Sequence, residues 1–375
     1  MRAELADARL ARYAGRFVWL SLNFDKPENQ PFLARHGVTY TPAFFVLDPS
    51  DERATASQLG GMTLAELTRF LERGERGVLT KPATPADAAL ARGDELLAQG
   101  KYADAASAYS EALKEGGRSF AEHDRAVASF TWALMSSGQT QICAETAAAE
   151  APLMARSQTF SRVVLAGVSC VNQDQTAAWA EAARKTLEPL AAEAVALPLT
   201  LRDHRFQLYQ QLMSAADARG DKATLKRWGE LWLKELDAAR PSNEDERTAL
   251  DVARVDAASL LGEPERVIPA LVASERLMPD NYNASLRLAQ METDAKRYAE
   301  AIAACERGLR HVTGPLGRMW LLEIEADALL GKGDAASARR VLADALRSAQ
   351  QIGVKQARER NVEKIQKALK DADKK

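Results

Sequence analysis

The chain has 375 residues, of which 50 are Lys or Arg and 52 are Asp or Glu, so its formal net charge is −2. This length exceeds one ordinary domain, and a hydrophobic content of 46% indicates a folded chain rather than a disordered one. The balanced charge excludes a general basic field, so we expect no nucleic-acid partner. No apolar run approaches the ~18 residues that a membrane span needs, so we expect no membrane span.

The first eighty residues predict an α/β arrangement. FVWLSLNFD (17–25) is an apolar run typical of a strand buried on both faces, and ENQPFLARHG (28–37) predicts a short helix. AFFVLD (43–48) and ATASQL (54–59) predict two further strands on either side of a turn. Thr63 and Glu66 have the spacing of a capping box, so MTLAELTRFLERG (62–74) should form the closing helix.

These residues resemble the thioredoxin superfamily. The resemblance rests on the strand that ends at Asp25, the HGV after the short helix, and TYTP directly before AFFVLD. It implies that the peptide bond before Pro42 is cis and that Tyr40, Thr41 and Pro42 form a peptide-binding surface. Because cis bonds are essentially confined to X–Pro, proline is the residue that can hold such a turn. The alternative is an ordinary proline at the entry to a strand.

The chain departs from that family at the redox motif. A CxxC belongs at the start of the helix before FVWLSLNFD, but the residues there are MRAELADARLARYAGR. The resemblance therefore covers residues 1–76, about two thirds of such a domain, without its first strand or reactive thiols. We expect a start mis-assigned at Met1, with decay to a binding remnant as the alternative. As written the chain is expected to be cytoplasmic, whereas an upstream start would allow the cell envelope or periplasm.

The remainder predicts an all-α region. We expect a linker at 77–86, within RGERGVLTKPATPAD (73–87), because this stretch lacks apolar periodicity. Residues 87–352 resemble tetratricopeptide repeats: Gly93, Ala105 and Tyr109 are in phase with that motif, and Val267, Ala301 and Ala338 follow at spacings of 34 and 37. The resemblance implies a helical solenoid of six or seven hairpins. We expect a solvated, charged helix or tail at 353–375. The fold class is thus α/β followed by all-α.

The chemistry-bearing residues are sparse. Cys143, Cys170 and Cys305 lie in Ala- and Leu-rich helical stretches without a CxxC pair, which predicts unpaired buried thiols. The four histidines are scattered, so we assign no metal, cofactor or catalytic residue. The tryptophans on apolar stripes are predicted to pack in the core; they are Trp132, Trp179, Trp228, Trp232 and Trp320.

The expected function is protein or peptide binding in the concave helical groove, next to a redox-inactive thioredoxin-like segment. A carboxylate clamp for a chaperone tail is not expected, because Leu90, Asp94, Leu286 and Gln290 occupy the positions that would supply it. The rival is a thiol–disulfide oxidoreductase whose CxxC lies upstream of Met1. A third reading is an assembly scaffold. The sequence does not name the partner.

Overall fold

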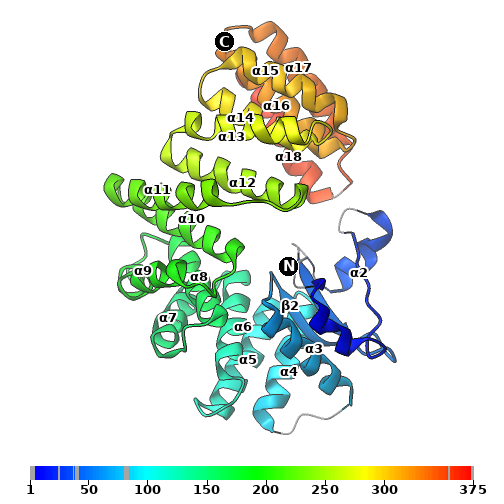
Figure 1. The fold of residues 1–375 in the computed structure, drawn as a ribbon, viewed down its shortest axis with the longest axis vertical. Coiled ribbons are helices and arrows are strands. Elements are labelled where there is room, and N and C mark those ends of the chain that lie inside the picture. Colours follow the sequence, from blue (N-terminus) through cyan, green and yellow to red (C-terminus); the bar gives the residue numbers. More distant parts are fainter. Residues whose placement is uncertain are drawn as a thin grey trace. The chain divides into compact units, whose positions relative to one another are not determined.

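The computed structural model describes residues 5–23, 26–36, 38, 42–79, 84–353 and 355–372. Within these residues helices predominate, and a small antiparallel sheet lies near the start of the chain (Figure 1). The chain divides into two compact units, Met1–Ala215 and Ala216–Lys375, which we call unit 1 and unit 2. No described helix combines the length and apolar character needed to cross a membrane.

Unit 1 opens with short helical turns, a strand pair and one long helix. These elements are η1 (Ala8–Tyr13), η2 (Pro27–Asn29), α2 (Gln30–Arg35), β1 (Ala43–Leu47), β2 (Ala54–Leu59) and α3 (Leu64–Leu79). The two strands pair antiparallel, with Phe44 opposite Gln58 and Val46 opposite Ala56. The expected strands at 43–48 and 54–59 are therefore confirmed. So is the capping box, because Glu66 accepts from the Thr63 backbone N–H at 2.9 Å.

Two helices pack against this sheet. Val46 and Ala56 pack in one cluster with Leu67 and Phe70 of α3, and the Ser57 hydroxyl donates to the backbone carbonyl of Asp94 on the helix after α3. The Thr55 hydroxyl donates to the Gly74 carbonyl of α3 at 2.8 Å, so both helices contact β2. Gly74 allows the close approach of α3, because a Cβ there would lie 2.5 Å from the Cβ of Val46.

The strand expected at 17–25 is not formed over its described residues, 17–23. Val18 is 87% exposed and Leu20 is 80% exposed, the reverse of the predicted burial. The described sheet has only β1 and β2, so no neighbouring strand satisfies the backbone groups of this run. The prediction was wrong because a strand depends on a partner that its own residues do not specify.

The structure describes both ends of the expected linker at 77–86. The helix α3 continues to Leu79, through all of RGERGVL, and the next helix begins at Pro85 behind a capping box of Thr84 and Asp87. Residues 80–83 lie outside the described residues. The α/β segment is not set apart by this junction, because β2 contacts the helix that follows it.

The rest of unit 1 is an array of antiparallel helices. Consecutive helices are in contact from the pair α4 and α5 to the pair α8 and α9, and α6 also contacts α8. The helices are α4 (Pro85–Ala98), α5 (Tyr102–Gly116), α6 (His123–Ser136), α7 (Thr140–Glu150), α8 (Gln158–Gln173), α9 (Ala180–Ala196) and α10 (Arg202–Ala218), with η3 (Ala151–Leu153) after α7. This pattern is compatible with a helical solenoid.

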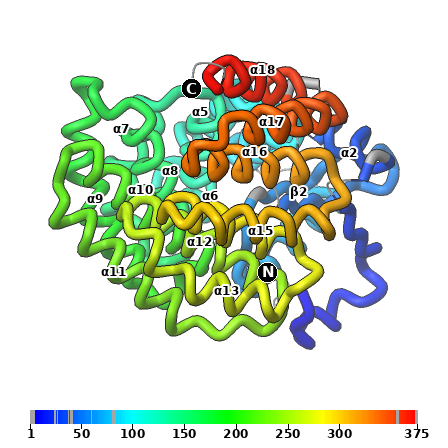
Figure 2. The backbone as a smooth tube through the Cα atoms, turned by 90° about the horizontal axis from the view of Figure 1, so that it is seen from above, coloured from blue at the N-terminus to red at the C-terminus, as the bar shows by residue number. Residues whose placement is uncertain are grey.

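Unit 2 is also an array of consecutive, contacting helices. Each helix from α11 to α18 contacts the next, and α14 also contacts α12 and α16. Figure 2 shows α16, α17 and α18 side by side. The elements are α11 (Lys222–Ala238), α12 (Glu244–Leu261), η4 (Pro264–Arg266), α13 (Ile268–Leu277), α14 (Tyr282–Asp294), α15 (Tyr298–His311), α16 (Pro315–Gly331), α17 (Ala335–Gln350) and α18 (Lys355–Ala372).

One turn recurs between paired helices. Its central residue has positive φ, and the following N–H bonds to a carbonyl five residues earlier, as in Lys101 to Leu96 at 2.9 Å and Arg297 to Glu292 at 2.8 Å. This is the Schellman ending of a helix, which favours glycine. The positive-φ residues are Gly100, Gly138, Gly220, Gly262, Lys296 and Gly333. The repeat is therefore visible in the backbone as well as in the side chains.

The first hairpin has the contact that the repeat pattern predicts. A Cβ on Gly93 would lie 2.6 Å from the Tyr109 ring, and Ala105 and Tyr109 are completely buried. The small residue thus leaves room for the aromatic ring between α4 and α5.

The C-terminal helix is not merely solvated. Ile365 of α18 is completely buried in a cluster with Met319 and Leu342, because α18 packs on α17 with an apolar stripe. Of the tryptophans, Trp228 and Trp232 are buried as expected, but Trp320 is 39% exposed.

Candidate functional site

Of the predicted site residues, only Pro42 lies in the described part of the chain; Tyr40 and Thr41 lie outside it. The half-buried Pro42 stands one residue before β1, and its carbonyl accepts from the Gly60 N–H at 2.8 Å. The peptide bond before Pro42 involves Thr41, so its isomer stays a prediction. Pro42 is nevertheless fixed beside the Gly60–Gly61 turn at the end of β2.

Residues 54–61, which we call the docked segment, lie along the helices of unit 1. Besides the Ser57 contact with α4, the Arg162 guanidinium of α8 donates to the Gln58 side-chain oxygen at 3.2 Å. At the end of the segment, a Cβ on Gly60 would lie 3.6 Å from His204 Nε2 of α10. The docked segment is therefore hydrogen-bonded to α4 and α8 and lies beside α10, each the first helix of a pair.

A buried charged network lies where α4 meets the docked segment. Asp94 is 3% exposed and accepts from Arg125 of α6 at 3.0 Å on each carboxylate oxygen, and from the Tyr109 hydroxyl at 2.8 Å. Arg125 Nε also donates to Glu122 at 2.8 Å. Desolvation raises the pKa of the Tyr109 phenol well above its ordinary value. The network is an internal ion pair whose partners are satisfied.

Arg73 of α3 extends this network toward the α/β segment. Burial, and then the neighbouring Arg125 charge, lower the pKa of Arg73 to about 10. The attraction of Asp94 and Glu122 acts in the opposite direction. Arg73 Nε is buried without a hydrogen-bond partner, so the attraction of these two carboxylates for the Arg73 charge acts over a longer range than a direct contact.

A neutral histidine holds the other end of the docked segment. The Gln158 amide of α8 donates to His204 Nδ1, and its carbonyl oxygen accepts from the Leu201 N–H at 2.8 Å. Burial, and then the nearby Arg162 charge, lower the pKa of His204 to about 3. This imidazole is uncharged near neutral pH, which suits it to packing against the Gly60 turn rather than to acid–base chemistry.

Six residues occupy one equivalent position in the repeats. Each stands six residues before a positive-φ turn residue, and we call them the first-helix row: Asp94, Trp132, Ser214, Asp256, Gln290 and Asp327. In unit 1, the buried Asp94 carboxylate contacts Tyr109 and Arg125, and its backbone carbonyl accepts from Ser57 of the docked segment. Within unit 2, Asp256 is half-buried, whereas Gln290 and Asp327 are exposed, and Trp320 lies two turns before Asp327 on the same side of α16.

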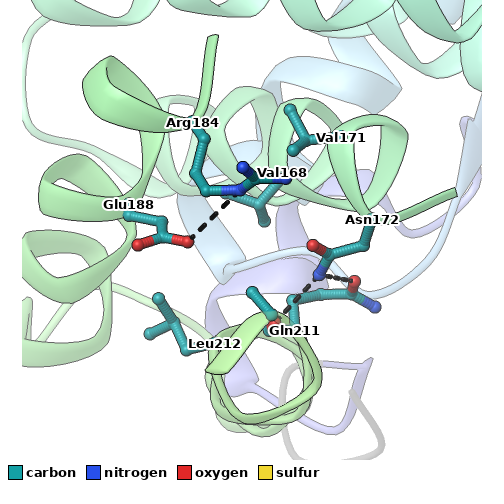
Figure 3. A pocket seen from close by; sticks show the side chains of 8 residues that line it. Val168, Val171, Asn172, Arg184, Glu188, Gln211 and Leu212 are labelled. Carbon is teal, nitrogen blue, oxygen red and sulfur yellow. Dashed lines mark hydrogen bonds and ion pairs between the residues drawn. The ribbon is translucent and has the colours of Figure 1, made fainter. Parts of the chain in front are cut away.

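A small cavity lies among α8, α9 and α10 (Figure 3). Its volume is about 10 Å³, and Asn172 Nδ2 donates across its wall to the Gln211 side-chain oxygen at 2.8 Å. Arg184 and Glu188 face each other on another wall, with Nε and Oε1 3.8 Å apart. This space is about that of one water molecule, so it is no site for a larger ligand.

The cysteines carry no exposed thiol chemistry. Cys143 and Cys170 form a disulfide, which corrects the prediction that both are unpaired, and Cys305 is a buried free thiol as expected. All three side chains are 0% exposed. Burial raises the pKa of Cys305 to about 12, so it does not supply a thiolate near neutral pH. Among the described residues, no cluster of His, Cys, Asp and Glu could hold a metal ion.

A scan for known protein families finds no match to this chain, and a search of curated proteins finds none either. The site therefore rests on the geometry of the described residues.

The sequence did not reveal the docked segment. Its small and polar residues are typical of an ordinary strand, and nothing in ATASQLGG specifies contacts with residues 37 to 144 positions later. The one available signal is the Gly60–Gly61 pair, because paired glycines mark places where another part of the chain approaches closely.

Proposed function

We propose that this chain is a polypeptide-binding scaffold in which residues 5–79 are a partial, redox-inactive thioredoxin-like segment and residues 84–352 are a tetratricopeptide-type solenoid. The order β1, turn, β2, glycine pair and α3 supports the first assignment, and the recurring turn with its small-residue contacts supports the second. In this proposal unit 1 holds a segment of its own chain, and unit 2 recruits a separate polypeptide.

One observation carries the proposal. The first-helix row is buried at Asp94, whose backbone carbonyl contacts the chain's own strand, and half-buried at Trp132, Ser214 and Asp256, but it is exposed at Gln290 and Asp327. Repeat proteins bind extended polypeptides along such rows, since each repeat offers an equivalent position. The docked segment is thus an internal example of the contact that unit 2 would make with its partner.

The exposed residues of the first-helix row in unit 2, together with Trp320, indicate the kind of partner. Trp320 offers a large apolar surface, and aromatic residues of this type are frequent anchors in protein interfaces. Gln290 offers an amide that both donates and accepts hydrogen bonds, as a peptide backbone requires. These groups suit a segment with one apolar anchor and exposed backbone groups. The docked segment contacts unit 1 through polar side-chain groups, the Ser57 hydroxyl and the Gln58 side-chain oxygen.

The test is site-specific photo-crosslinking in the full chain. A photoreactive phenylalanine analogue replaces Trp320 in one variant and Leu277 in another; Leu277, on α13, is 61% exposed and is the matched control. We expect crosslinked polypeptides from Trp320 and none from Leu277. The captured polypeptide is then purified and titrated against the wild type and Trp320→Ala, with Leu277→Ala as control.

Tenfold or greater weakening by Trp320→Ala alone would support the proposal, since an interface anchor contributes at least ~1.4 kcal/mol. Equal crosslinking at the two positions, or unchanged affinity in Trp320→Ala, would contradict it. Measurable disulfide reductase activity of the chain in an insulin assay would contradict the redox-inactive part.

A further inference from the structure

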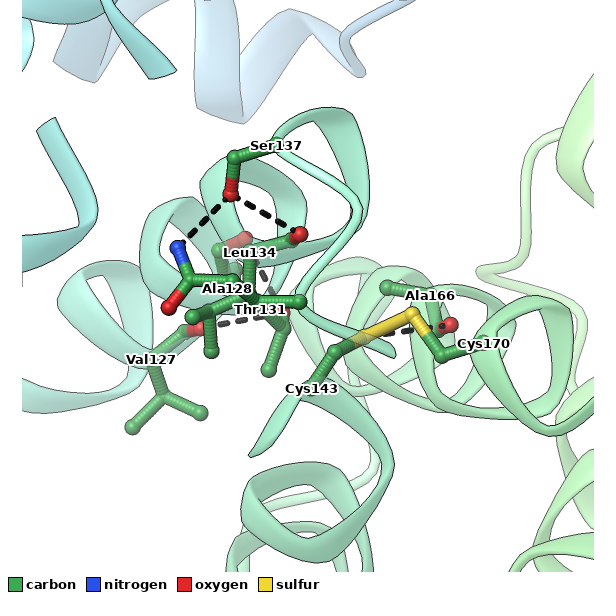
Figure 4. Close-up of a disulfide and its surroundings, with 9 residues drawn as sticks. Val127, Ala128, Thr131, Leu134, Ser137, Cys143, Ala166 and Cys170 are labelled. Atoms are coloured by element: carbon green, nitrogen blue, oxygen red, sulfur yellow. Dashed lines mark hydrogen bonds between the residues drawn. A yellow bond between two sulfur atoms is a disulfide. The ribbon is translucent and has the colours of Figure 1, made fainter. Parts of the chain in front are cut away.

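Cys143 of α7 and Cys170 of α8 join neighbouring helices of unit 1 (Figure 4). Their Cα atoms are 6.3 Å apart, which is within the range that a disulfide spans. The sulfurs are bonded across 27 positions of sequence, and both side chains are completely buried.

The surroundings of this disulfide are tightly packed. Ala144 and Ala147 of α7 are completely buried, and a Cβ on Gly167 of α8 would lie 2.5 Å from the Cβ of Ala147. The two helices therefore approach through small residues, which leaves no path for a dissolved oxidant once they have closed. The thiols must meet their oxidant before this part of unit 1 is complete.

We propose that Cys143 and Cys170 are an oxidation site, and that the chain is the substrate of a disulfide donor in an oxidising compartment. Reducing compartments keep structural thiols reduced, so a permanent buried disulfide belongs to a chain that folds outside them. This inference does not depend on the proposed binding function.

The reaction is thiol–disulfide exchange with a donor of the disulfide class, either a protein dithiol oxidase or a small-molecule disulfide. The thiolate of one cysteine attacks a donor sulfur, forms a mixed disulfide and releases the donor's other sulfur as a thiolate. The second cysteine then attacks its partner's sulfur in the mixed disulfide and displaces the donor. The chain loses two electrons and two protons, and the donor gains them as a dithiol or two thiols.

Cys305 provides an internal comparison. It is completely buried in α15 of unit 2 and stays a free thiol. The proposal therefore specifies one link between two named residues rather than general oxidation. The full chain should contain one free thiol before reduction and three after it.

The test is thiol counting on the full chain taken from the cells that make it. Acid quenching traps the redox state, and alkylation in denaturant without reductant is followed by intact mass measurement. We expect one label, on Cys305, and a Cys143–Cys170 peptide pair after digestion. Reduction should raise the count to three. Three labels without reductant would overturn the proposal.

Two further measurements keep the test decisive. A Cys305→Ala chain should take no label before reduction and two after it; any other pair of counts would contradict the assignment. Wild-type chain unfolded, reduced and refolded with oxidised and reduced glutathione should recover the Cys143–Cys170 link. Links from Cys305 to either of the other cysteines as the major product would also overturn it.

Discussion

Arg125 donates through one nitrogen, Nη1, to both carboxylate oxygens of Asp94, at 3.0 Å each, across the gap between α6 and α4. Asp94 is also the residue whose backbone carbonyl receives the Ser57 hydroxyl of the docked segment. One buried carboxylate therefore joins the first two helical pairs, and its backbone holds the chain's own strand.

The variant Arg125→Met should strongly destabilise unit 1. The substitution leaves the Asp94 carboxylate buried without its cation, which costs about 3–5 kcal/mol. Chemical denaturation followed by circular dichroism measures the change. Arg92→Met is the matched control, since Arg92 and its partner Glu111 are both about half exposed, and it should change stability little. Equal losses in the two variants would contradict the role of the buried pair.

Stability should fall below pH 6.5 through His204. The unfolded imidazole binds a proton below its ordinary pKa of 6.5, whereas the folded one stays neutral until pH about 3. The unfolded state therefore binds more protons in this window, and stability declines as the pH falls. Wild type should lose about 1.7 kcal/mol more than His204→Gln between pH 6.5 and pH 5.

The measurement is the free energy of unfolding at pH 6.5 and pH 5 for both chains. Identical pH profiles of wild type and His204→Gln would show that His204 is not held neutral.

The variant Lys296→Gly should stabilise unit 2. Lys296 has φ of 60° at the turn where glycine usually stands, and this conformation costs a side-chain-bearing residue about 1 kcal/mol or more. We expect a net gain of ~0.5 kcal/mol after the entropy cost of glycine in the unfolded chain. Thermal unfolding measures it.

The reverse substitution, Gly333→Ala, tests the same cause. Gly333 has φ of 85°, and a Cβ there would meet no atom within 4 Å, so only backbone strain would act. This variant should lose about 1 kcal/mol. Stabilisation by Gly333→Ala would contradict the account of the turn.

Reduction of the Cys143–Cys170 disulfide should lower the free energy of unfolding of unit 1. By the loop-closure model, a link across 27 positions stabilises the fold by about 3.5 kcal/mol. Wild type should therefore unfold at lower denaturant concentration with reductant than without it. The double variant Cys143→Ala and Cys170→Ala should show no effect of reductant. A reductant effect in that variant would assign the loss to another cause.

Local signals in the sequence predicted local structure well. The capping box of Thr63 and Glu66 and the contact of Gly93 with Tyr109 both depend on residues close in sequence, so their spacing was sufficient. The helices of residues 84–352 followed from apolar periodicity for the same reason.

The failures involve partners that are distant in sequence. FVWLSLN has strand composition but no pairing strand among the described residues, and the pairing of Cys143 with Cys170 depends on how α7 packs on α8. Trp320 shares its apolar periodicity with buried tryptophans, yet it lies on the exposed side of α16. Periodicity indicates which residues share a face but not what covers that face.

The central claim is that the helices of unit 1 bind the docked segment of the same chain, whereas the exposed part of the first-helix row in unit 2 binds a separate polypeptide. Hydrogen–deuterium exchange on the full chain, free and with the polypeptide captured at Trp320, tests it most directly. We predict slow exchange across residues 54–61 in both states, and slowed exchange in α14 and α16 only when the partner is bound. Faster exchange of residues 54–61 on binding, with α14 and α16 unchanged, would contradict the claim.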